Sequence, residues 1–227
     1  MIRFERTTNA TCCDATGLVV VIDVLRAFTT AAYAFAAGAE KIILVREVEE
    51  ALNLREQIPG ALVMGEVGGL PPAGFNYGNS PSALVGLELT NRTIIQRTGA
   101  GTQGVVLSAG ADTLLAASFA CARATLRYIQ QHSPAGVTMV ITGRRLNDHG
   151  DEDAAFADYL EALLSGAQPD PQPYLERVRR SRDAIEDAHH FPGFDADMAC
   201  CTTIDHVDFA MVVQRENGLH VMRPVFP

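Results

Sequence analysis

The sequence lacks the features that would place it in a membrane or on a nucleic acid. It holds no run of about 18 apolar residues, the length that spans a bilayer. The opening residues MIRFERTTNATCCD contain no apolar stretch typical of a secretion signal. Its 18 Lys and Arg are outnumbered by 27 Asp and Glu, which gives a formal net charge of −9. Nucleic-acid and anionic-membrane surfaces need a basic face, so we expect a cytoplasmic protein that binds neither.

Cysteine is scarce and poorly spaced for disulfides or zinc. The five cysteines form two adjacent pairs and one isolated position, Cys12, Cys13, Cys121, Cys200 and Cys201. The number is odd, and the two-residue gaps of zinc knuckles are absent. We therefore expect reduced, mostly structural cysteines. A thiol or zinc enzyme built on Cys200, Cys201 and His206 stays open as an alternative.

No low-complexity tract or long charge block interrupts the chain, and 48% of its 227 residues are hydrophobic. This composition is that of a compact globular protein, and the length suffices for one domain or two tightly packed halves.

One stretch, LVVVIDVLRAFTT, organises the rest of the chain. Leu18 to Ile22 form a continuous β-branched run typical of a strand buried on both faces of a parallel sheet. Asp23 follows at the carboxyl end of this strand, the edge where open α/β sheets bind ligands. Three or four residues separate Arg26 from Thr29 and Thr30, a spacing that would point one cation and two hydroxyls at one anion if all three lie on one helix. The simpler alternative is that Asp23 only caps the helix.

Strand and helix patterns alternate along the chain. We predict strands at 41–45, 61–64, 93–96 and 138–142, helices at 26–37, 47–57, 113–131 and 174–190, a helix opening at 151, and a hairpin pairing 206–214 with 218–225 that caps the sheet. This order predicts an α/β fold with three α/β/α layers and a mixed, largely parallel sheet. The motif AGAE at 37–40 returns as AGAD before the predicted helix at 113, which suggests two similar subdomains, 1–88 and 89–227, flanking a cleft.

Two glycine-rich loops follow predicted strands. The first runs from Gly65 and Glu66 to the GNSP motif, where it offers Gly78, Asn79 and Ser80. We weigh a binding loop and a long surface turn equally there. The second loop resembles a phosphate cradle, because glycines expose backbone N–H groups, threonines add hydroxyls and arginine adds charge; its members are Arg97, Thr98, Gly99, Gly101 and Thr102. It is not a Walker loop, because the GK[ST] ending is absent.

The predicted strand at 138–142 ends in Gly143 and Arg144, and Asp151, Glu152 and Asp153 then open a helix. Acids in a first helical turn are favoured by the helix dipole, which would explain all three. Three acids so close to a strand end nevertheless exceed what capping needs.

Five separated blocks, VIDVLRAFTT, GEVGG, GFNYGNSP, RTGAGTQG and GRRLNDHGDED, resemble the 2-phosphosulfolactate phosphatase family, also called the ComB family. The resemblance covers most of the chain. It implies a magnesium-dependent hydrolase that removes phosphate from 2-phospho-3-sulfolactate, on the route to coenzyme M, or from a similar small phosphorylated acid. It also implies a homodimer. The chain departs from the family where Arg97 to Thr102 replace a Thr-Thr-Asn-Gly-Thr type of loop, and where Phe28 stands in place of a third hydroxyl residue.

The resemblance assigns roles that suit hydrolysis of a phosphate monoester. Asp23 and Glu66, with help from Glu152 or Asp153, would hold Mg²⁺. A spare carboxylate would deprotonate the attacking water, and Asp153 is counted with the catalytic residues for this reason. Arg26 and Arg97 would bind phosphate oxygens, and Arg144 would pair with the sulfonate or carboxylate. The remaining substrate-binding candidates are Thr29, Thr30, Gly78, Asn79, Ser80, Thr98, Gly99, Gly101, Thr102 and Gly143.

Two questions stay open at this point. Direct attack by water competes with an aspartyl-phosphate on Asp23; the absence of a DxDxT pattern favours water. A non-catalytic binder of small phosphorylated acids would keep the arginines and glycine loops without needing a metal.

Overall fold

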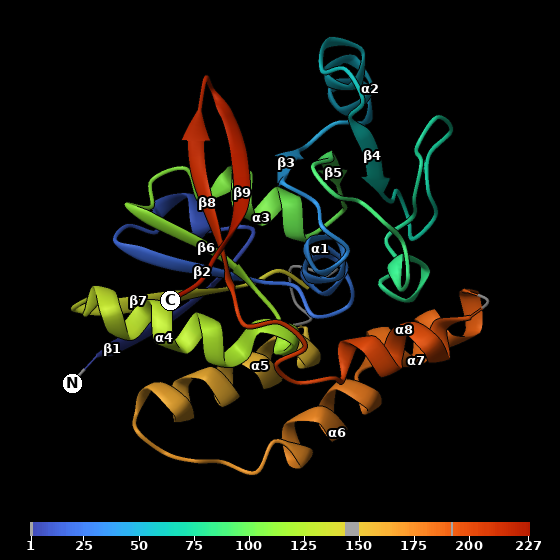
Figure 1. Cartoon of the computed structure of the whole chain (residues 1–227). Helices are drawn as coiled ribbons and strands as arrows, with labels where there is room; N and C mark the ends of the chain where they lie inside the picture. Colours follow the sequence, from blue (N-terminus) through green and yellow to red (C-terminus); the bar gives the residue numbers. More distant parts are fainter. Residues whose placement is uncertain (1, 144–149, 192) are drawn as a thin grey trace.

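The computed structural model describes residues 2–143, 150–191 and 193–227 (Figure 1). Nine strands form one continuous sheet in the order β1-β7-β2-β6-β8-β9-β3-β5-β4. Five of the strand pairings are parallel and three are antiparallel. The predicted α/β fold with a mixed, largely parallel sheet is therefore confirmed. The three layers and the two similar halves stay predictions.

The strands are β1 (Arg3–Thr8), β2 (Leu18–Ile22), β3 (Lys41–Val45), β4 (Leu62–Gly65), β5 (Thr93–Arg97), β6 (Thr113–Ala117), β7 (Gly136–Ile141), β8 (Ala210–Glu216) and β9 (Leu219–Val225). The helices are α1 (Ala27–Ala36), α2 (Val48–Gln57), α3 (Gly101–Leu107), α4 (Ala122–His132), α5 (Asp151–Leu164), α6 (Gln172–Arg180), α7 (Arg182–His190) and α8 (Phe194–Cys201). Across the described ranges, no helix is long and apolar enough to cross a bilayer.

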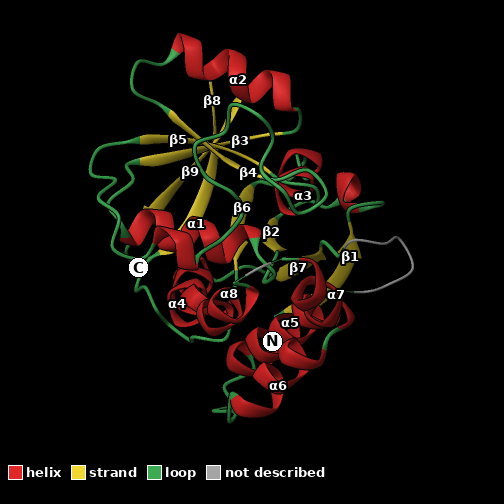
Figure 2. Cartoon of the chain, turned by 90° about the vertical axis from the view of Figure 1, so that its right-hand side faces the viewer, coloured by secondary structure: helices red, strands yellow, loops and turns green. Residues whose placement is uncertain are grey.

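The sheet consists of two parallel blocks joined by a hairpin. The first block is β1-β7-β2-β6 and the second is β3-β5-β4, while β8 and β9 lie between them. Three successive antiparallel pairings separate β6 from β3, so the two blocks run in opposite directions. Figure 2 shows the strands fanned by a strong twist, the usual result of strand geometry. Each block draws one or more strands from residues 1–88 and one or more from 89–227, and the predicted boundary between these halves stays a prediction.

Both faces of the second block are covered by apolar side chains. Along β3, Ile42 and Leu44 join the main core, while Ile43 and Val45 join a smaller cluster that includes Ala51 of α2. Successive residues of a strand point to opposite faces, so α2 covers one face and the main core covers the other. In the first block all five residues of β2 are buried, as the β-branched run predicted.

The C-terminal hairpin forms as predicted, but its place in the sheet was predicted wrongly. It does not cap the sheet, because it forms the two central strands that join the blocks. The physical reason lies in β8, whose first four residues, AMVV, are all buried. A continuous apolar run needs cover on both faces, and a central position supplies it. Asn217 and Gly218 make the turn with φ of 51° and 83°, as Asn-Gly turns do.

The predicted helix at 113–131 is also wrong in its first half. Residues 113–117 form strand β6 between β2 and β8, and α4 begins only at Ala122. Periodicity cannot separate a short buried strand from a buried helix when every residue is apolar or small. The Ser118 hydroxyl accepts a hydrogen bond from the Ala120 N–H and so starts the helical turn that follows the strand.

The predicted helix at 174–190 is two helices, α6 and α7. They are separated at Ser181, whose ψ of 154° is extended and whose hydroxyl accepts a hydrogen bond from the Ala184 N–H as the N-cap of α7. Strand β1 and helix α8 were not predicted at all. The polar composition of residues 3–8 hid β1, an edge strand with three exposed and three half-buried residues.

Candidate active site

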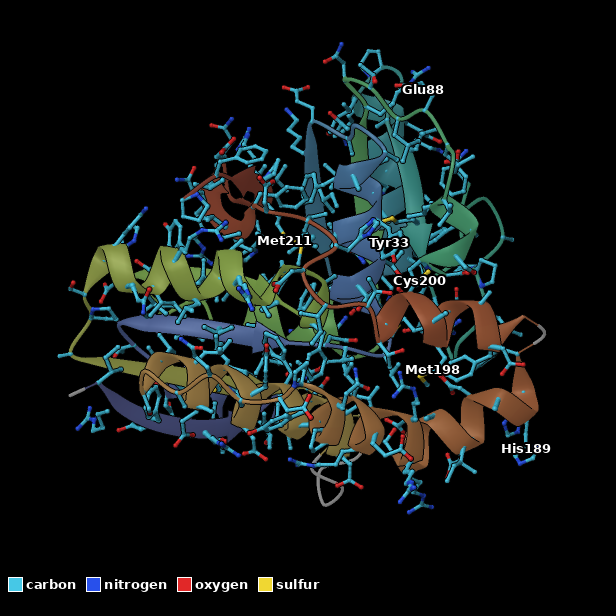
Figure 3. All side chains as sticks on the ribbon, turned by 60° about the horizontal axis from the view of Figure 1, so that its bottom comes forward. Tyr33, Glu88, His189, Met198, Cys200 and Met211 are labelled. Atoms are coloured by element: carbon cyan, nitrogen blue, oxygen red, sulfur yellow. The ribbon has the colours of Figure 1, made fainter. Side chains whose placement is uncertain are left out.

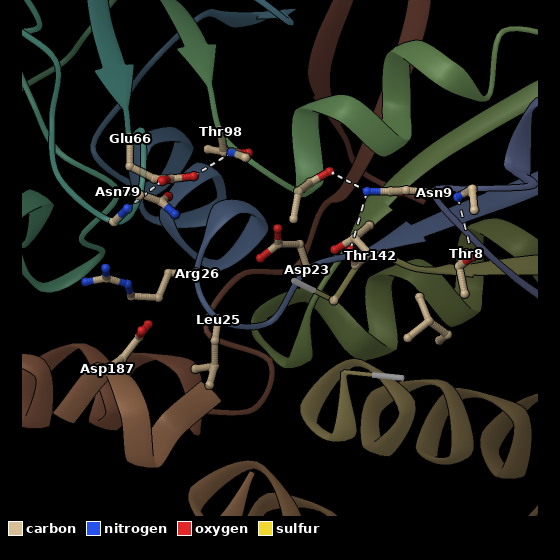
Figure 4. Close-up of a pocket in the computed structure, with 17 residues that line it drawn as sticks. Thr8, Asn9, Asp23, Leu25, Arg26, Glu66, Asn79, Thr98, Thr142 and Asp187 are labelled. Atoms are coloured by element: carbon tan, nitrogen blue, oxygen red, sulfur yellow. Dashed lines mark hydrogen bonds between the residues drawn. The ribbon is translucent and has the colours of Figure 1, made fainter. Parts of the chain in front are cut away.

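A cavity of about 450 Å³ lies where the carboxyl ends of strands from both blocks meet (Figure 4). The first block contributes the residues after β1, β2 and β7, and the second contributes those after β4 and β5. Its lining residues are Thr8, Asn9, Ala10, Asp23, Leu25, Arg26, Glu66, Gly68, Gly69, Asn79, Thr98, Gly99, Ala100, Ile141, Thr142, Gly143 and Asp187. Parallel strands in α/β sheets bind ligands at these ends. Here the twist of the sheet brings together the ends of two blocks that run in opposite directions.

Asp23 is a buried carboxylate at this edge. Its Oδ1 accepts a hydrogen bond of 2.9 Å from the Ala27 N–H at the start of α1, although Arg26 and not Asp23 is the N-cap residue of this helix. Burial raises the pKa of Asp23 to about 7, and the nearby negative charge of Glu66 adds to the shift. Gly101 lets α3 approach, because a Cβ there would lie 2.7 Å from Asp23 Oδ2. Asp23 is thus more than a cap, since it is a cavity-lining carboxyl that titrates near neutral pH.

Glu152 and Asp153 stand in the first turn of α5 but do not line the cavity. Asp153 is 2% exposed; its Oδ1 accepts from the Val24 N–H at 2.8 Å, and its Oδ2 accepts from the Thr142 N–H and hydroxyl at 3.2 Å each. Burial raises its pKa, and the charges of Glu152 and Asp23 raise it further. Burial also raises the pKa of Glu152 to about 8. These two acids therefore lie in an electrostatically coupled group with Asp23, which dipole capping alone does not explain.

Glu66 connects the two glycine-rich loops. Its Oε2 accepts from the Gly69 N–H at 2.7 Å, and its Oε1 accepts from the Gly99 N–H at 2.5 Å. Gly65 is required just before it, because its φ is 134° and a Cβ would lie 1.8 Å from the Arg97 carbonyl oxygen. The Glu66 carboxylate thus lines the cavity and also holds the loops that form it.

Arg26 is a buried cation at the start of α1. Its Nη1 lies 2.6 Å from Asp197 Oδ2, and its guanidinium lies 5.1 Å from the Phe191 ring centre and 5.5 Å from that of Phe194. Figure 4 places Arg26 between Glu66 and Asn79 on one side and Asp187 on the other. The predicted cation therefore does reach the cavity.

Thr29 and Thr30 do not share that position. Both are fully buried, neither lines the cavity, and the Thr29 hydroxyl donates to the Val24 carbonyl at 2.9 Å. The prediction placed Arg26 inside the helix. Arg26 is instead its N-cap, with φ of −142° and ψ of 0°, so the helical spacing that would align the three side chains does not apply.

The loop at 97–102 reaches the cavity only in part. Thr98 and Gly99 line it, whereas Arg97, Gly101 and Thr102 do not. The Arg97 guanidinium donates to the carbonyls of Arg46 and Glu66 at 2.9 and 2.7 Å. The Thr98 N–H donates to the Thr102 hydroxyl, and the Thr102 N–H donates to the Thr98 hydroxyl, at 2.8 and 3.1 Å. Much of the expected phosphate cradle is thus used to fix its own turn.

The GNSP motif divides in the same way. Asn79 is 8% exposed and lines the cavity, and its Oδ1 has no hydrogen-bond partner among the described residues. Gly78 and Ser80 do not line it, and the Ser80 hydroxyl donates to Asp197 Oδ1 at 2.7 Å. Gly143 lines the cavity, while Arg144 lies outside the described residues.

Several cavity residues were missed from the sequence. Asn9 follows β1, a strand that was not predicted. Thr142 directly follows β7, and the prediction named its neighbours Gly143 and Arg144 instead. Asp187 and the Arg26 partner Asp197 lie on α7 and α8, far along the chain from the strand ends. Strand-end position could have found Asn9 and Thr142. No local pattern marks Asp197, because its role depends on tertiary packing.

The cavity carboxylates are of the ligand type that Mg²⁺ prefers, which is oxygen. Within the part of the chain that is described, no group of three or more His, Cys, Asp or Glu lies close enough to hold a metal ion. Mg²⁺ needs fewer protein ligands, because it is usually bound through one or two carboxylates, waters and substrate phosphates. Asp23 and Glu66 are the two predicted metal ligands that reach the cavity. Bound Mg²⁺ would also offset the burial, and the smaller effect of the Glu66 charge, that raise the pKa of Asp23.

The cysteine alternative is disfavoured. Cys200 lies beside Tyr33 (Figure 3), and His206 stacks on the Tyr33 ring with 4.1 Å between ring centres. Burial raises the thiol pKa of both Cys200 and Cys201, whereas reactive thiols have lowered values. The absence of a metal-binding group noted above, over the described residues, applies to these side chains as well.

Comparison with known proteins agrees with the motifs. The sequence pattern of the 2-phosphosulpholactate phosphatase family matches residues 5–216. A Bacillus subtilis (strain 168) protein named "Probable 2-phosphosulfolactate phosphatase" is 32% identical over 210 residues, 91% of each chain. A protein of the same name from Thermotoga maritima is 32% identical over 216 residues, 90% of this chain and 91% of its own. Another, from Carboxydothermus hydrogenoformans, is 42% identical over 147 residues, 65% of this chain and 60% of its own. The chain therefore belongs to the 2-phosphosulpholactate phosphatase family.

Proposed function

We propose that the protein hydrolyses the phosphate monoester of 2-phospho-3-sulfolactate, or of a similar small phosphorylated 2-hydroxy acid, in a Mg²⁺-dependent reaction. Membership of the family makes the chain a phosphoric monoester hydrolase. The observation that carries the proposal is one cavity in which the cation of Arg26 lies with the carboxylates of Asp23 and Glu66. Phosphoryl transfer needs charge neutralisation and positioning more than any special nucleophile, and this set of groups supplies both.

The side chains divide the work by their charge and partners. Arg26 binds oxygens of the anionic substrate, since its guanidinium offers five N–H donors and one of them bonds Asp197. Thr98 and Asn79, whose Oδ1 has no hydrogen-bond partner among the described residues, orient the substrate from the second block. Mg²⁺ held by Asp23 and Glu66 would supply further neutralisation of phosphate charge.

Asp23 is the group placed to handle a proton or a phosphoryl group. In the metal-free protein its pKa of about 7 makes both protonation states available at neutral pH, whereas a bound Mg²⁺ would keep it ionised and able to accept a proton. In direct hydrolysis it takes a proton from the attacking water; in a covalent route its Oδ2 is the nucleophile. Acid quenching during a single turnover of ³²P-labelled substrate separates the two, because label recovered on the protein would reject direct water attack.

Phosphate release by the purified protein tests the proposal. The substrate panel is 2-phosphosulfolactate, phospholactate, phosphoglycolate and 3-phosphoglycerate, each with Mg²⁺ present. We expect turnover of at least one acid and the highest kcat/KM for 2-phosphosulfolactate if the sulfonate is recognised. Absence of turnover on every member would reject the hydrolase.

A binding protein for the same acids is the second candidate. It is favoured by the carboxylates of Glu66 and Asp153, whose oxygens already accept hydrogen bonds from the chain. Calorimetry that finds tight binding of 2-phosphosulfolactate without Mg²⁺, together with no phosphate release, would establish this function instead. Association into a homodimer stays a prediction, and sedimentation of the purified protein measures it.

A further inference from the structure

Helix α8 supplies an acid that contacts the cavity arginine directly. We propose that Asp197 is a positioning residue that orients Arg26 toward the substrate, an inference that rests on the function proposed above. The ion pair joins Arg26 Nη1 to Asp197 Oδ2 at 2.6 Å, and the two side chains are 7% and 3% exposed. The residues are separated by 171 positions in the sequence, so this contact is made only by the folded chain.

The other oxygen of Asp197 holds the GNSP loop. Oδ1 accepts from the Ser80 hydroxyl at 2.7 Å, the Ser82 hydroxyl at 2.6 Å and the Ser82 N–H at 3.0 Å. Asn79, which lines the cavity, directly precedes these serines in the sequence. One carboxylate therefore binds Arg26 and also the loop that carries Asn79, through Ser80 and Ser82.

Two aromatic rings also contact the Arg26 guanidinium. Phe194 and Asp197 are three residues apart on α8 and so lie on one face of the helix. Phe194 and Phe191 place their rings 5.5 and 5.1 Å from the Arg26 guanidinium, within the range of cation–π attraction. The guanidinium is thereby restrained by the ion pair and by two rings while it still lines the cavity.

The charge of Arg26 stays available for an anion. Asp197 shares its negative charge among four hydrogen bonds, and Arg26 gives only its Nη1 to this carboxylate. The remaining N–H groups can reach a ligand. A displacement of about 1 Å in such a group costs on the order of 10²-fold in rate, so its placement matters as much as its charge.

A double-mutant cycle on kcat/KM for phosphate release tests the inference. The variants are Asp197→Asn, Arg26→Gln and the double variant. Asn keeps the volume of Asp and an oxygen for the serines, but removes the charge that restrains Arg26. We expect Asp197→Asn alone to lower kcat/KM on the order of 10²-fold, and to have little further effect when Arg26 is already Gln. An equal fold-loss in both backgrounds, or none in the wild-type background, would overturn the proposal.

Controls separate positioning from folding. Asp195→Asn makes the same change at an exposed site of α8 and should leave kcat/KM unchanged. If Asp197→Asn does not fold, Ser82→Ala removes one of the four bonds to Asp197 at a residue not adjacent to Asn79, and gives the same test at smaller scale. Its loss must again vanish in the Arg26→Gln background; a loss that persists there rejects the inference.

Calorimetry with inorganic phosphate distinguishes failure of this inference from failure of the proposed function. If the wild type binds phosphate but turns over no substrate, the proposed hydrolase function is rejected. The same double-mutant cycle, measured on phosphate affinity, then still tests the role of Asp197. The positioning role is supported if Asp197→Asn weakens phosphate binding in the wild-type background but causes no further weakening in the Arg26→Gln background. Absence of phosphate binding by the wild type, together with absence of turnover, would overturn both.

Discussion

The carboxylates of the two strand blocks differ in what surrounds them. Asp23, from the first block, lies in a group of buried acids with Glu152 and Asp153, and burial with like charges raises its pKa to about 7. Glu66, from the second block, has a backbone N–H on each carboxylate oxygen. The first arrangement crowds carboxyls in a buried site, which raises their pKa, and such sites are common where chemistry occurs. The second uses its charge to hold loops. We infer that Asp23 performs the chemistry and that Glu66 mainly shapes the cavity.

Neutralising each carboxylate is the strongest way to break this comparison. We expect Asp23→Asn to lower kcat on the order of 10³-fold, because it removes the group placed to handle a proton or a phosphoryl group. Glu66→Gln should lower kcat by only about 10-fold, because Gln keeps one oxygen that can accept from a loop N–H and bind the metal. Steady-state phosphate release measures both. A larger loss for Glu66→Gln would reverse the assignment.

The two predicted phosphate-binding arginines give a similar contrast. Arg26 lines the cavity, whereas Arg97 donates to two backbone carbonyls and does not line it. Arg26→Gln should lower kcat/KM by about 10²- to 10³-fold, the usual loss on removing a charged donor from the reacting group. Arg97→Gln should lower it by no more than about 10-fold. Equal losses in the kinetic comparison would place Arg97 on the substrate after all.

Substitutions at two glycines test, through the free energy of unfolding, how closely the chain packs around Asp23. A Cβ at Gly101 would lie 2.7 Å from Asp23 Oδ2 and 2.8 Å from Ala27 Cβ, whereas a Cβ at Gly78 would find its nearest atom at 3.8 Å. Gly101→Ala should therefore lower the free energy of unfolding by about 1–3 kcal/mol, as overpacking does. Gly78→Ala should change it by less than about 0.5 kcal/mol. Urea unfolding measures both, and a neutral Gly101→Ala would show that α3 need not approach Asp23 so closely.

The buried acids of the first block also predict a pH dependence of stability. Folding raises the pKa of Asp23 to about 7 and that of Glu152 to about 8, so both carboxyls hold their protons more tightly in the folded state. Their contribution to stability is therefore greatest below the ordinary carboxyl pKa of about 4 and is lost as the pH rises toward about 8. In EDTA, Tm should fall as the pH rises from about 5 to about 8, and less so in Asp23→Asn. A Tm that rises across this window, equally in both proteins, would contradict these shifts.

The fold was predictable where one pattern had one structural meaning. The β-branched run at Leu18–Ile22 and the Asn-Gly turn at Asn217 each match the structure. The strand at 113–117, TLLAA, was not predictable, because small apolar residues suit a buried strand and a buried helix equally. The central place of the hairpin was hidden for another reason, since the order of strands in a sheet depends on contacts between distant segments.

The site residues, too, were predictable only where a local sequence pattern marks them. Asp23, Glu66 and Gly143 were found because parallel strands expose their carboxyl ends to ligands, and all three line the cavity. Thr29 was misplaced because the exact first residue of a helix decides which side chains share a face, and sequence does not fix that residue. Asp197 could not be found at all, because only the folded chain brings it to Arg26.

The most direct test of the account is phosphate release from 2-phosphosulfolactate by protein first stripped with EDTA and then supplied with Mg²⁺. The account predicts no turnover in EDTA, full recovery on adding Mg²⁺, and no recovery in Asp23→Asn that remains folded by circular dichroism. Turnover that persists in EDTA, or that Mg²⁺ restores equally in Asp23→Asn, would contradict the claim that Asp23 and a bound cation act together in this cavity.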